Sequence, residues 1–250
     1  MIKGILIAFL MVLSFGGAMA QSGKTFIIDE DIQLIHLQDS IYIHKTYHYF
    51  EAFGRFSSNG LLMIKNGQAL LVDTPTDNAK TEKLASYIKD SLGAEIKQLV
   101  IGHFHEDCLG GLEYLKSIGV SSLANSLTVA KCKTDSLSIP SESFTGSKTF
   151  SFNGEAIACR FFGGGHSFDN ITVWLPNQKI LVGGCMVRAS AAKGLGNLSD
   201  AVLAEWDGSI QKVWDAYPNA NSVIPGHGNY GGTELLSHTI ELVKAHKAKN

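Results

Sequence analysis

The pattern of hydrophobic and polar positions divides the chain into short strands and amphipathic helices. Three segments contain two apolar runs separated by turn-forming residues, an arrangement typical of a β-hairpin. These hairpins are expected at residues 61–74, 151–162 and 171–184, with turns at Asn66-Gly67, Asn153-Gly154 and Pro176-Asn177. Further strands are expected at residues 31–37, 40–44, 97–102 and 222–226. Because hairpins occur in both halves of the chain, the sheets are predicted to be mixed or largely antiparallel.

Helices are predicted where capping residues flank a segment with apolar positions three or four residues apart. The first spans residues 78–92, with Thr76 or Asp77 as its N-cap and Gly93 closing it. Others are expected between Gly111 and Gly119, after Asn125, at residues 202–216, and from the capping residue Thr233 to about Ala248. Strands and helices alternate without a low-complexity linker, which predicts layered α/β packing. The hairpins argue against a Rossmann fold or a TIM barrel, where helices separate nearly every strand pair.

The first twenty residues form a segment of a different kind. They carry one positive charge at Lys3, an apolar stretch from about Gly4 to Phe15, and the small-x-small sequence Ala18-Met19-Ala20. These features are typical of a secretory signal peptide, and the apolar stretch is short for a membrane-spanning helix. We therefore expect residues 1–20 to be removed on export and residues 21–250 to form a single domain. A retained N-terminal anchor is the alternative.

The composition is that of an ordinary globular protein, with 45% hydrophobic and 18% charged residues and a net charge of −2. Neither a nucleic-acid partner nor binding to a membrane surface is indicated, because both favour a surplus of positive charge. Nine histidines accompany four cysteines, which lack CxxC spacing. This favours histidine-based metal chemistry over a zinc ribbon or a redox pair, and no disulfide is expected.

The stretch GHFHEDCLGG at residues 102–111 carries three side chains that are able to bind a metal. It follows an apolar run and places His103, His105 and Asp107 at alternate positions. A strand that runs out into a loop directs alternate side chains to one side, so these three are predicted to cluster. Imidazole and carboxylate groups are good zinc ligands. For this motif alone, a chance loop sequence remains the alternative.

Three more candidate ligands leave predicted strands in glycine-rich turns. They are His166 in GGGHSFDN, Cys185 in GGCM and His227 in PGHG. Such turns provide the flexible backbone and low steric bulk that converging side chains need at the rim of a sheet. Taken singly, each histidine is equally well a hydrogen-bonded loop residue, and a cysteine such as Cys185 is more often a small buried hydrophobic residue than a ligand. Together with residues 102–111, they predict a metal site.

The sequences HFHED, GGGHS, GGC and PGHG, in this order, resemble the motifs of the metallo-β-lactamase superfamily. The cysteine of GGCMVR, with a histidine downstream in PGHG, is similar to the B1 subclass of β-lactamases. VDTP (72–75), VWLPNQKILVGGCMV (173–187) and GLGNLSDA (194–201) extend the resemblance over nearly the whole chain after residue 20. The resemblance implies an αββα sandwich, an α/β fold in which two mixed β-sheets pack face to face with helices on the outer faces.

The resemblance also implies two zinc sites. The two ligand sets are His103, His105 and His166 for the first Zn²⁺, and Asp107, Cys185 and His227 for the second. In the family, a zinc-bound hydroxide opens the β-lactam amide of penicillins, cephalosporins and carbapenems, and Asp107 is expected to help orient it. The resemblance therefore implies a monomeric, periplasmic, zinc-dependent β-lactamase whose partner is a small-molecule β-lactam.

Residues that contact substrate are implied by the same resemblance. Arg188 stands where the family commonly has lysine and is expected to pair with the substrate carboxylate; a solvated surface charge is the alternative. Asn197 matches a position thought to help bind substrate or the oxyanion, with a turn residue as the alternative. Residues 46–60 match a flap over the site. Thr76 stands where the family often has tryptophan, so one wall of the site is expected to be smaller.

Cys108 occupies the position at which many other hydrolases of the superfamily carry a metal-binding histidine. The resemblance therefore puts Cys108 behind the metal ligands, with a third metal site as the alternative. Asp73 is expected either to fix the orientation of a ligand or to cap local amides. Two other functions stay open. Hydrolysis of a thioester or lactone is disfavoured by Cys185 and the missing histidine, and non-enzymatic zinc binding is weakly disfavoured by the three-histidine set.

Overall fold

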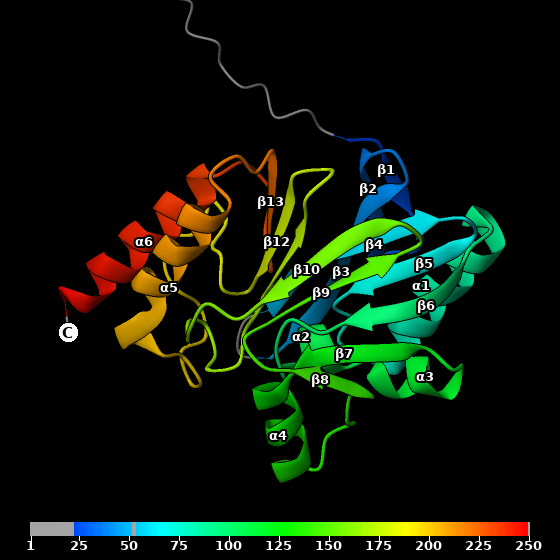
Figure 1. The fold of residues 1–250 in the computed structure, drawn as a ribbon, viewed down its shortest axis with the longest axis horizontal. Helices are drawn as coiled ribbons and strands as arrows, with labels where there is room; N and C mark the ends of the chain where they lie inside the picture. Colours follow the sequence, from blue (N-terminus) through cyan, green and yellow to red (C-terminus); the bar gives the residue numbers. More distant parts are fainter. Residues whose placement is uncertain (1–22, 52–53, 250) are drawn as a thin grey trace, which may run out of the picture.

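The computed structural model describes residues 23–51 and 54–249, and two β-sheets form its centre (Figure 1). The larger sheet has the strand order β1-β2-β3-β4-β5-β6-β7-β8. Neighbouring strands are antiparallel from β1 to β5 and parallel from β5 to β8. Its strands are β1 (Thr25–Ile27), β2 (Ile32–Gln38), β3 (Ile41–Phe50), β4 (Gly54–Lys65), β5 (Gln68–Val72), β6 (Glu95–Val100), β7 (Ser121–Asn125) and β8 (Glu142–Phe144).

The smaller sheet has the strand order β13-β12-β11-β10-β9. Its neighbours are antiparallel except for β12 and β13, which run parallel. Its strands are β9 (Ser147–Phe152), β10 (Glu155–Arg160), β11 (Thr172–Leu175), β12 (Ile180–Gly184) and β13 (Ser222–Pro225). Both sheets are therefore mixed, as the hairpins in both halves of the sequence predict.

Helices cover the outer face of each sheet (Figure 1). On the larger sheet lie α1 (Asn78–Leu92), α3 (Leu112–Ser117) and α4 (Ser126–Thr134), and on the smaller sheet lie α5 (Leu203–Ala216) and α6 (Glu234–Lys247). The short helix α2 (Glu106–Leu109) lies at the edge where the candidate ligands converge. The αββα sandwich predicted from the resemblance is confirmed.

Successive side chains of the central strands pack into different hydrophobic cores. Leu70 of β5 lies in the core between the sheets, whereas Leu71 packs under α1 and α3. Ile224 of β13 likewise joins the core between the sheets, and Val223 packs against α5 and α6. A strand that is buried on both faces needs apolar residues at consecutive positions. This explains why these strands appear in the sequence as short unbroken apolar runs.

Two of the three predicted hairpins turn where the sequence indicates. Asn66 and Gly67 both have positive φ, as do Asn153 and Gly154, and the flanking strands pair directly across each turn. Two successive residues with positive φ give the turn that matches the twist of a hairpin. The third hairpin has a longer turn than Pro176-Asn177, because its strands end at Leu175 and resume at Ile180.

The capping prediction is confirmed for α1, and a helix follows Asn125 as predicted. The Asp77 side chain accepts a hydrogen bond from the Lys80 amide at 2.7 Å, and Gly93 closes α1 with φ 64°. Asn125 caps α4 through the Leu127 amide. Thr233 stands at the N-cap of α6, but its side chain makes no capping hydrogen bond. The short elements β1, β7, β8 and α2 are not predicted from the sequence, and the proposed signal segment 1–20 lies outside the described residues.

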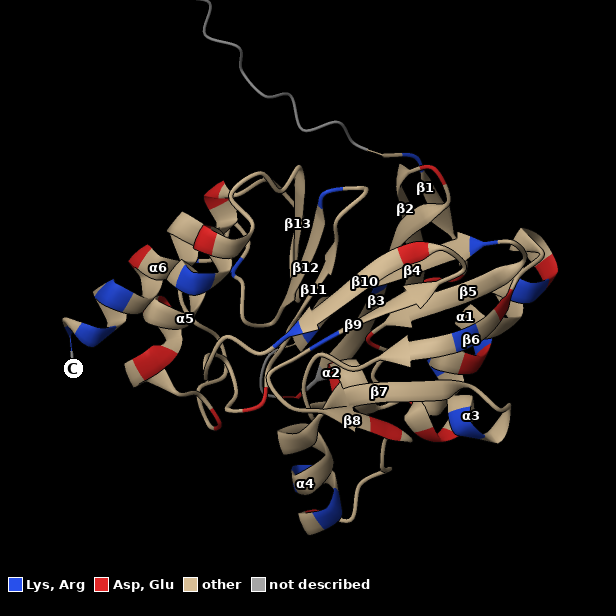
Figure 2. Ribbon diagram, in the orientation of Figure 1, with Lys and Arg blue, Asp and Glu red and all other residues tan. Residues whose placement is uncertain are grey.

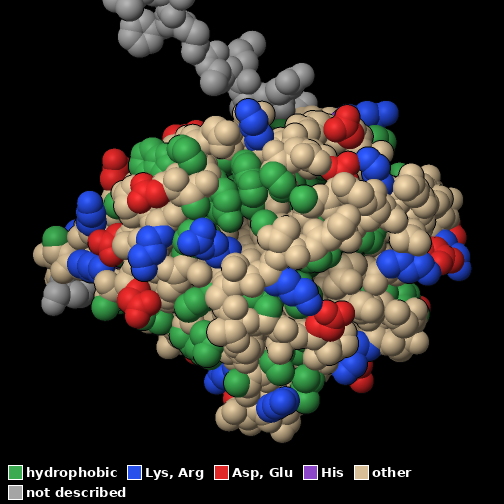
Figure 3. All heavy atoms as spheres, in the orientation of Figure 1, with side chains coloured by type: hydrophobic (Ala, Val, Ile, Leu, Met, Phe, Trp, Pro, Cys, Tyr) green, Lys and Arg blue, Asp and Glu red, His purple; other side chains and the backbone are tan. Residues whose placement is uncertain are grey.

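Charged residues of both signs are interspersed over the helices and loops, and the facing strands carry few of them (Figure 2). On the face of Figure 3, small groups of apolar side chains are exposed between acidic and basic ones. Within the described part of the chain, every helix falls short of the length and hydrophobicity required to cross a membrane.

Trp206 is the largest side chain in the core beneath α5 and α6, and it is fully buried. Its indole Nε1 donates to the Met186 carbonyl oxygen at 2.8 Å. Trp206→Ala is expected to lower the free energy of unfolding by about 3–5 kcal/mol, because it leaves a cavity and an unpaired carbonyl. Urea unfolding of the metal-free protein measures this. Trp214 is on the same helix but only half-buried. An equal loss in Trp214→Ala would contradict the assignment.

Candidate metal centre

The candidate ligands converge because the loops that carry them are joined at one edge of the sandwich. The Ile171 amide donates to the Gly102 carbonyl at 2.9 Å, which joins the loop of His103 and His105 to that of His166. The Gly226 amide donates to the Gly184 carbonyl at 2.7 Å, which joins the loops of Cys185 and His227. A Cβ atom at position 226 would collide with the sulfur of Cys185. Glycine at 226 is therefore needed for the two ligand loops to approach.

Three imidazole nitrogens meet in the first set. His105 Nδ1 lies 2.9 Å from His103 Nε2 and 3.1 Å from His166 Nε2. Four-coordinate zinc, with Zn–N distances of about 2.0–2.1 Å, holds neighbouring ligand nitrogens about 3.3 Å apart. Burial lowers the pKa of His103 and of His166, so both rings stay neutral and keep a lone pair for a metal. The set has the composition and spacing of a three-histidine zinc site.

Asp107, Cys185 and His227 form the second set. The Cys185 sulfur lies 3.2 Å from Asp107 Oδ2 and 3.4 Å from His227 Nε2, and the last two atoms are 3.4 Å apart. Burial lowers the pKa of His227, but Cys185 and Asp107 raise it to about 10. The carboxylate and the thiol thus attract a positive charge into this space, which a divalent cation supplies. The donor set fits zinc.

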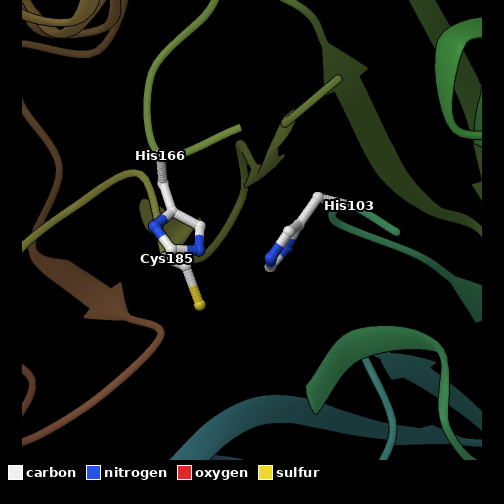
Figure 4. A group of neighbouring side chains, drawn as sticks. All are labelled: His103, His166 and Cys185. Atoms are coloured by element: carbon white, nitrogen blue, oxygen red, sulfur yellow. The ribbon is translucent and has the colours of Figure 1, made fainter. Parts of the chain in front are cut away.

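The two sets share one space. His103, His166 and Cys185 point toward one another (Figure 4), and their ligand atoms all lie within 4.8 Å of each other. Asp107 Oδ1 lies 3.9 Å from His103 Nε2, so the carboxylate stands between the sets. Two metal ions bound here would therefore be neighbours.

The clustering of Asp107 has a different cause from the one that the sequence suggests. His103 and His105 lie in the loop after β6, whereas Asp107 lies in the first turn of α2. The prediction that the three side chains cluster holds. The explanation by alternation in an extended segment is wrong for Asp107, since a helical turn rather than a strand directs its carboxylate toward the histidines.

A different group holds the outer ring nitrogen of each of three histidines, His103, His105 and His227. Asp200 Oδ2 lies 3.0 Å from His105 Nε2, and the Ser57 carbonyl oxygen lies 2.9 Å from His227 Nδ1. Cys108 Sγ lies 3.1 Å from His103 Nδ1. Such contacts fix the tautomer and the ring orientation of a metal-binding histidine. The sequence reasoning did not find Asp200, although it belongs to the quoted motif GLGNLSDA.

Asp169 is a buried carboxylate that the sequence reasoning also missed. It accepts hydrogen bonds from the Phe104 amide at 3.0 Å and from the hydroxyls of Thr128 and Ser167, both at 2.7 Å. These three donors satisfy a fully buried charge and tie the loop of His103 to the loop of His166. The available signal was an acid three residues after His166, within the motif GGGHSFDN.

The other predicted residues line the cavity above the ligands. Arg188, Asn197 and Thr76 border a cavity of about 580 Å³ together with His105, Asp107, His166 and His227. Arg188 is half-buried, and its Nε donates to the Gly194 carbonyl at 3.2 Å. Asn197 is exposed and accepts from the Ser199 amide at 3.1 Å, so it is also a turn residue.

The predicted flap is the hairpin of β3 and β4. His48 and Phe56 of this hairpin line the cavity, and their rings meet edge to face at 4.5 Å between centroids. Phe56 also packs against the ring of His227. Tyr49 is 74% exposed, and Phe53 lies outside the described residues. One wall of the cavity is therefore part of the β3–β4 hairpin, with Thr76 contacting His48 at 3.4 Å.

The known proteins that this chain resembles in sequence and in structure include several metallo-β-lactamases. The chain is 42% identical to a metallo-β-lactamase type 2 from Bacteroides fragilis, over 94% of each protein. It resembles the structure of a metallo-β-lactamase from Pontibacter korlensis with a TM-score of 0.82 and 37% identity, over 85% of this chain and 99% of that one. It also resembles the structure of the metallo-β-lactamase FIM-1 from Pseudomonas aeruginosa in its mono-zinc form. The TM-score is 0.82 and the identity 29%, over 88% of this chain and 98% of that one. No protein-family model matches the chain.

Asp200→Ala is expected to weaken zinc binding by the three-histidine set about 10–100-fold, because His105 loses the partner of its outer nitrogen. Competition with a chromophoric chelator measures the affinity. Asp207→Ala provides the control, since that carboxylate pairs with Lys247 at 2.7 Å. If both variants bind zinc as the unmodified protein does, Asp200 has no part in holding the site.

Proposed function

Because the chain belongs to the metallo-β-lactamase family and is similar to its B1 subclass, we propose that it is an exported, zinc-dependent β-lactamase. Its proposed reaction is hydrolysis of the β-lactam amide of penicillins, cephalosporins and carbapenems. The observation that carries the proposal is the convergence of two complementary donor sets at the base of one cavity of about 580 Å³.

The proposed ligands of the first Zn²⁺ are His103, His105 and His166, and those of the second are Asp107, Cys185 and His227. Zinc bound in this way would supply Lewis acidity and lower the pKa of water from 15.7 to about 7. The three imidazoles are neutral donors, so a Zn²⁺ ion held by them would remain strongly electrophilic. The carboxylate and thiolate of the second set balance the charge of a second ion, which favours occupancy of both positions.

Asp107 is the proposed positioning group for the attacking water. Its Oδ2 faces Cys185 and His227, while its Oδ1 faces His103 Nε2. Burial would raise the pKa of this carboxyl, but the positive charge of His227 and the hydrogen bond from Cys185 hold it well below its usual range, so it is ionised and accepts a hydrogen bond. Asp107 stands between the two ligand sets and lines the cavity. A water molecule held by Asp107 would therefore face the carbonyl carbon of a substrate bound in that cavity.

Arg188 and Asn197 are the proposed substrate contacts. Arg188 is held at the cavity wall because its backbone amide donates to Thr239 Oγ1 at 2.8 Å and its Nε to the Gly194 carbonyl. The rest of the guanidinium is then available for the carboxylate that β-lactams carry beside the fused ring. Asn197 lines the same cavity, and its amide nitrogen is the donor proposed for the substrate or the oxyanion.

Export rests on the sequence of residues 1–20. We propose that this segment is a cleaved signal peptide, that residues 21–250 form a single periplasmic domain, and that the protein is a monomer. The support comes from Lys3, the apolar stretch after it and the small-x-small sequence ending at Ala20. The six proposed ligands all come from the single sandwich that follows this segment.

The purified mature chain is expected to hydrolyse a carbapenem, to lose this activity with EDTA, and to regain it when zinc is added back. Removing the metal removes the electrophile and the activation of water. Loss of the ultraviolet absorbance of the β-lactam ring follows the reaction. Two bound zinc ions without turnover of any β-lactam would refute the proposed function, and hydrolysis of a thioester or lactone by that protein would replace it.

Arg188→Ala is expected to raise KM for a β-lactam about tenfold or more with a smaller effect on kcat, because a hydrogen bond to a charged group contributes about 1.5–3 kcal/mol. Initial rates measure both constants. Arg188→Lys is expected to keep most of the affinity, and the methyl ester of the same substrate should respond little to either change. An equal effect of Arg188→Ala on acid and ester would refute carboxylate pairing.

A further inference from the structure

One wall of the cavity belongs to a long irregular connection between β12 and α5. This connection, the cavity loop, comprises residues 185–202, none of which lies in a helix or strand. Connections longer than about 12–15 residues without regular structure are uncommon in compact domains and are often binding loops. Arg188, Gly196 and Asn197 of the cavity loop line the cavity. The conformation of this loop therefore decides where Arg188 stands.

The middle of the cavity loop is exposed, although buried residues flank it. Val187 and Leu195 pack in the core beneath α5 and α6. Within residues 190–194, Ala192 is half-buried and the other four are exposed. A stretch with so little buried apolar surface opens at low cost, so its hydrogen bonds determine how firmly it is held.

Helix α6 supplies hydrogen bonds to the cavity loop through two consecutive residues. His238 Nε2 lies 2.9 Å from the Ala192 carbonyl oxygen. A carbonyl oxygen only accepts, so the imidazole N–H of His238 donates. The next residue, Thr239, accepts the Arg188 amide at its Oγ1 at 2.8 Å, and its hydroxyl donates to the Leu235 carbonyl at 2.7 Å. The helix thus holds the loop at Arg188 and again four residues later.

The held stretch in turn holds the guanidinium group. Two residues after Ala192, the Gly194 carbonyl accepts a hydrogen bond from Arg188 Nε at 3.2 Å. Gly196 also lies against this group: its φ is 76°, and a Cβ atom there would come within 3.2 Å of Arg188 Nη1. Glycine is needed at 196 both for the left-handed turn and for the space that the guanidinium occupies. The direction of the guanidinium therefore follows the position of residues 192–196.

We propose that His238 is a positioning residue that sets where Arg188 meets the substrate. Its N–H holds the Ala192 carbonyl, which keeps the Gly194 carbonyl in place to direct the guanidinium. His238 acts through the backbone of the cavity loop, because it is not among the described residues that line the cavity. The inference rests on the proposed function, in which Arg188 pairs with the substrate carboxylate, and it assigns a role in substrate binding to a helix outside the cavity.

His238→Ala is expected to raise KM for a carboxylate-bearing β-lactam about two- to tenfold, the range that corresponds to the loss of one hydrogen bond. Little change in kcat is expected, because the candidate metal ligands are held by other contacts. His238→Gln is expected to restore most of the affinity, since its amide N–H lies about as far along the side chain as Nε2. KM for the methyl ester of the same substrate should respond little to either change.

A double-mutant cycle separates positioning of Arg188 from a general loss of stability. If His238 acts through Arg188, adding His238→Ala to Arg188→Ala is expected to leave KM where Arg188→Ala alone puts it. Independent effects that multiply in the double variant would overturn the inference, because they would place the action of His238 elsewhere.

His36→Ala is the matched control. His36 Nε2 lies 2.8 Å from the Asp39 carbonyl oxygen, next to the turn between β2 and β3. The substitution removes the same kind of hydrogen bond from a part of the larger sheet that does not line the cavity. It is expected to leave KM unchanged. A rise in KM equal to that of His238→Ala would contradict the positioning role.

Hydrogen exchange tests the same contact without turnover. The Ala192 amide donates to the Ala189 carbonyl at 2.9 Å, so its exchange rate in the metal-free protein reports opening of the exposed stretch. His238→Ala is expected to speed this exchange about two- to tenfold, His238→Gln less, and His36→Ala not at all. Unchanged exchange in His238→Ala would overturn the inference. If the exchange differences are found but the unmodified protein hydrolyses no β-lactam, the hold of α6 on the loop stands and the proposed function is refuted.

Discussion

A partly buried carboxylate and a buried thiol lie side by side at the edge of the sandwich, and this pair sets the main electrostatic constraint on the structure. Asp107 Oδ2 and the Cys185 sulfur lie 3.2 Å apart and both face His227. Burying such a pair without a positive charge is costly. In the metal-free protein a proton on His227 supplies the positive charge, since Cys185 and Asp107 raise the pKa of that imidazole to about 10. A divalent cation would stabilise the pair further, because it would coordinate the Cys185 sulfur, Asp107 Oδ2 and His227 Nε2 together. The architecture around the pair serves to keep these atoms together.

The candidate metal ligands are kept together by hydrogen bonds between the loops that carry them. Backbone hydrogen bonds link Gly102 to Ile171 and Gly184 to Gly226, and each joins two ligand loops that are far apart in sequence. Asp169 adds a third link through Phe104, Thr128 and Ser167. Loops held in this way behave as parts of a rigid scaffold, which a metal site with several ligands requires.

The extent to which the sequence predicts the fold differs between elements. Hairpins at 66–67 and 153–154 and the caps of α1 follow from local chemistry, since Asn-Gly pairs, Asp77 and Gly93 act within a few residues of their own position. Strand β7 and helix α2 do not follow from local chemistry. Strand β7 is stabilised by pairing with β6 and β8 on either side, and α2 has only four residues. Their existence depends on neighbours that no local pattern reveals.

For the candidate centre, the sequence by itself determined the donor types and the four motifs that carry them, because metal-binding side chains and glycine-rich turns are local properties. It also determined the resemblance that grouped the donors into two sets. Only the tertiary structure decided which further groups act on them. Asp200 and Ser57 contact His105 and His227 from distant parts of the chain, Asp169 reaches the distant residues Phe104 and Thr128, and Cys108 meets His103 only after α2 has turned. The physical reason is that hydrogen bonds depend on ångström-scale geometry, which chain folding rather than residue spacing creates.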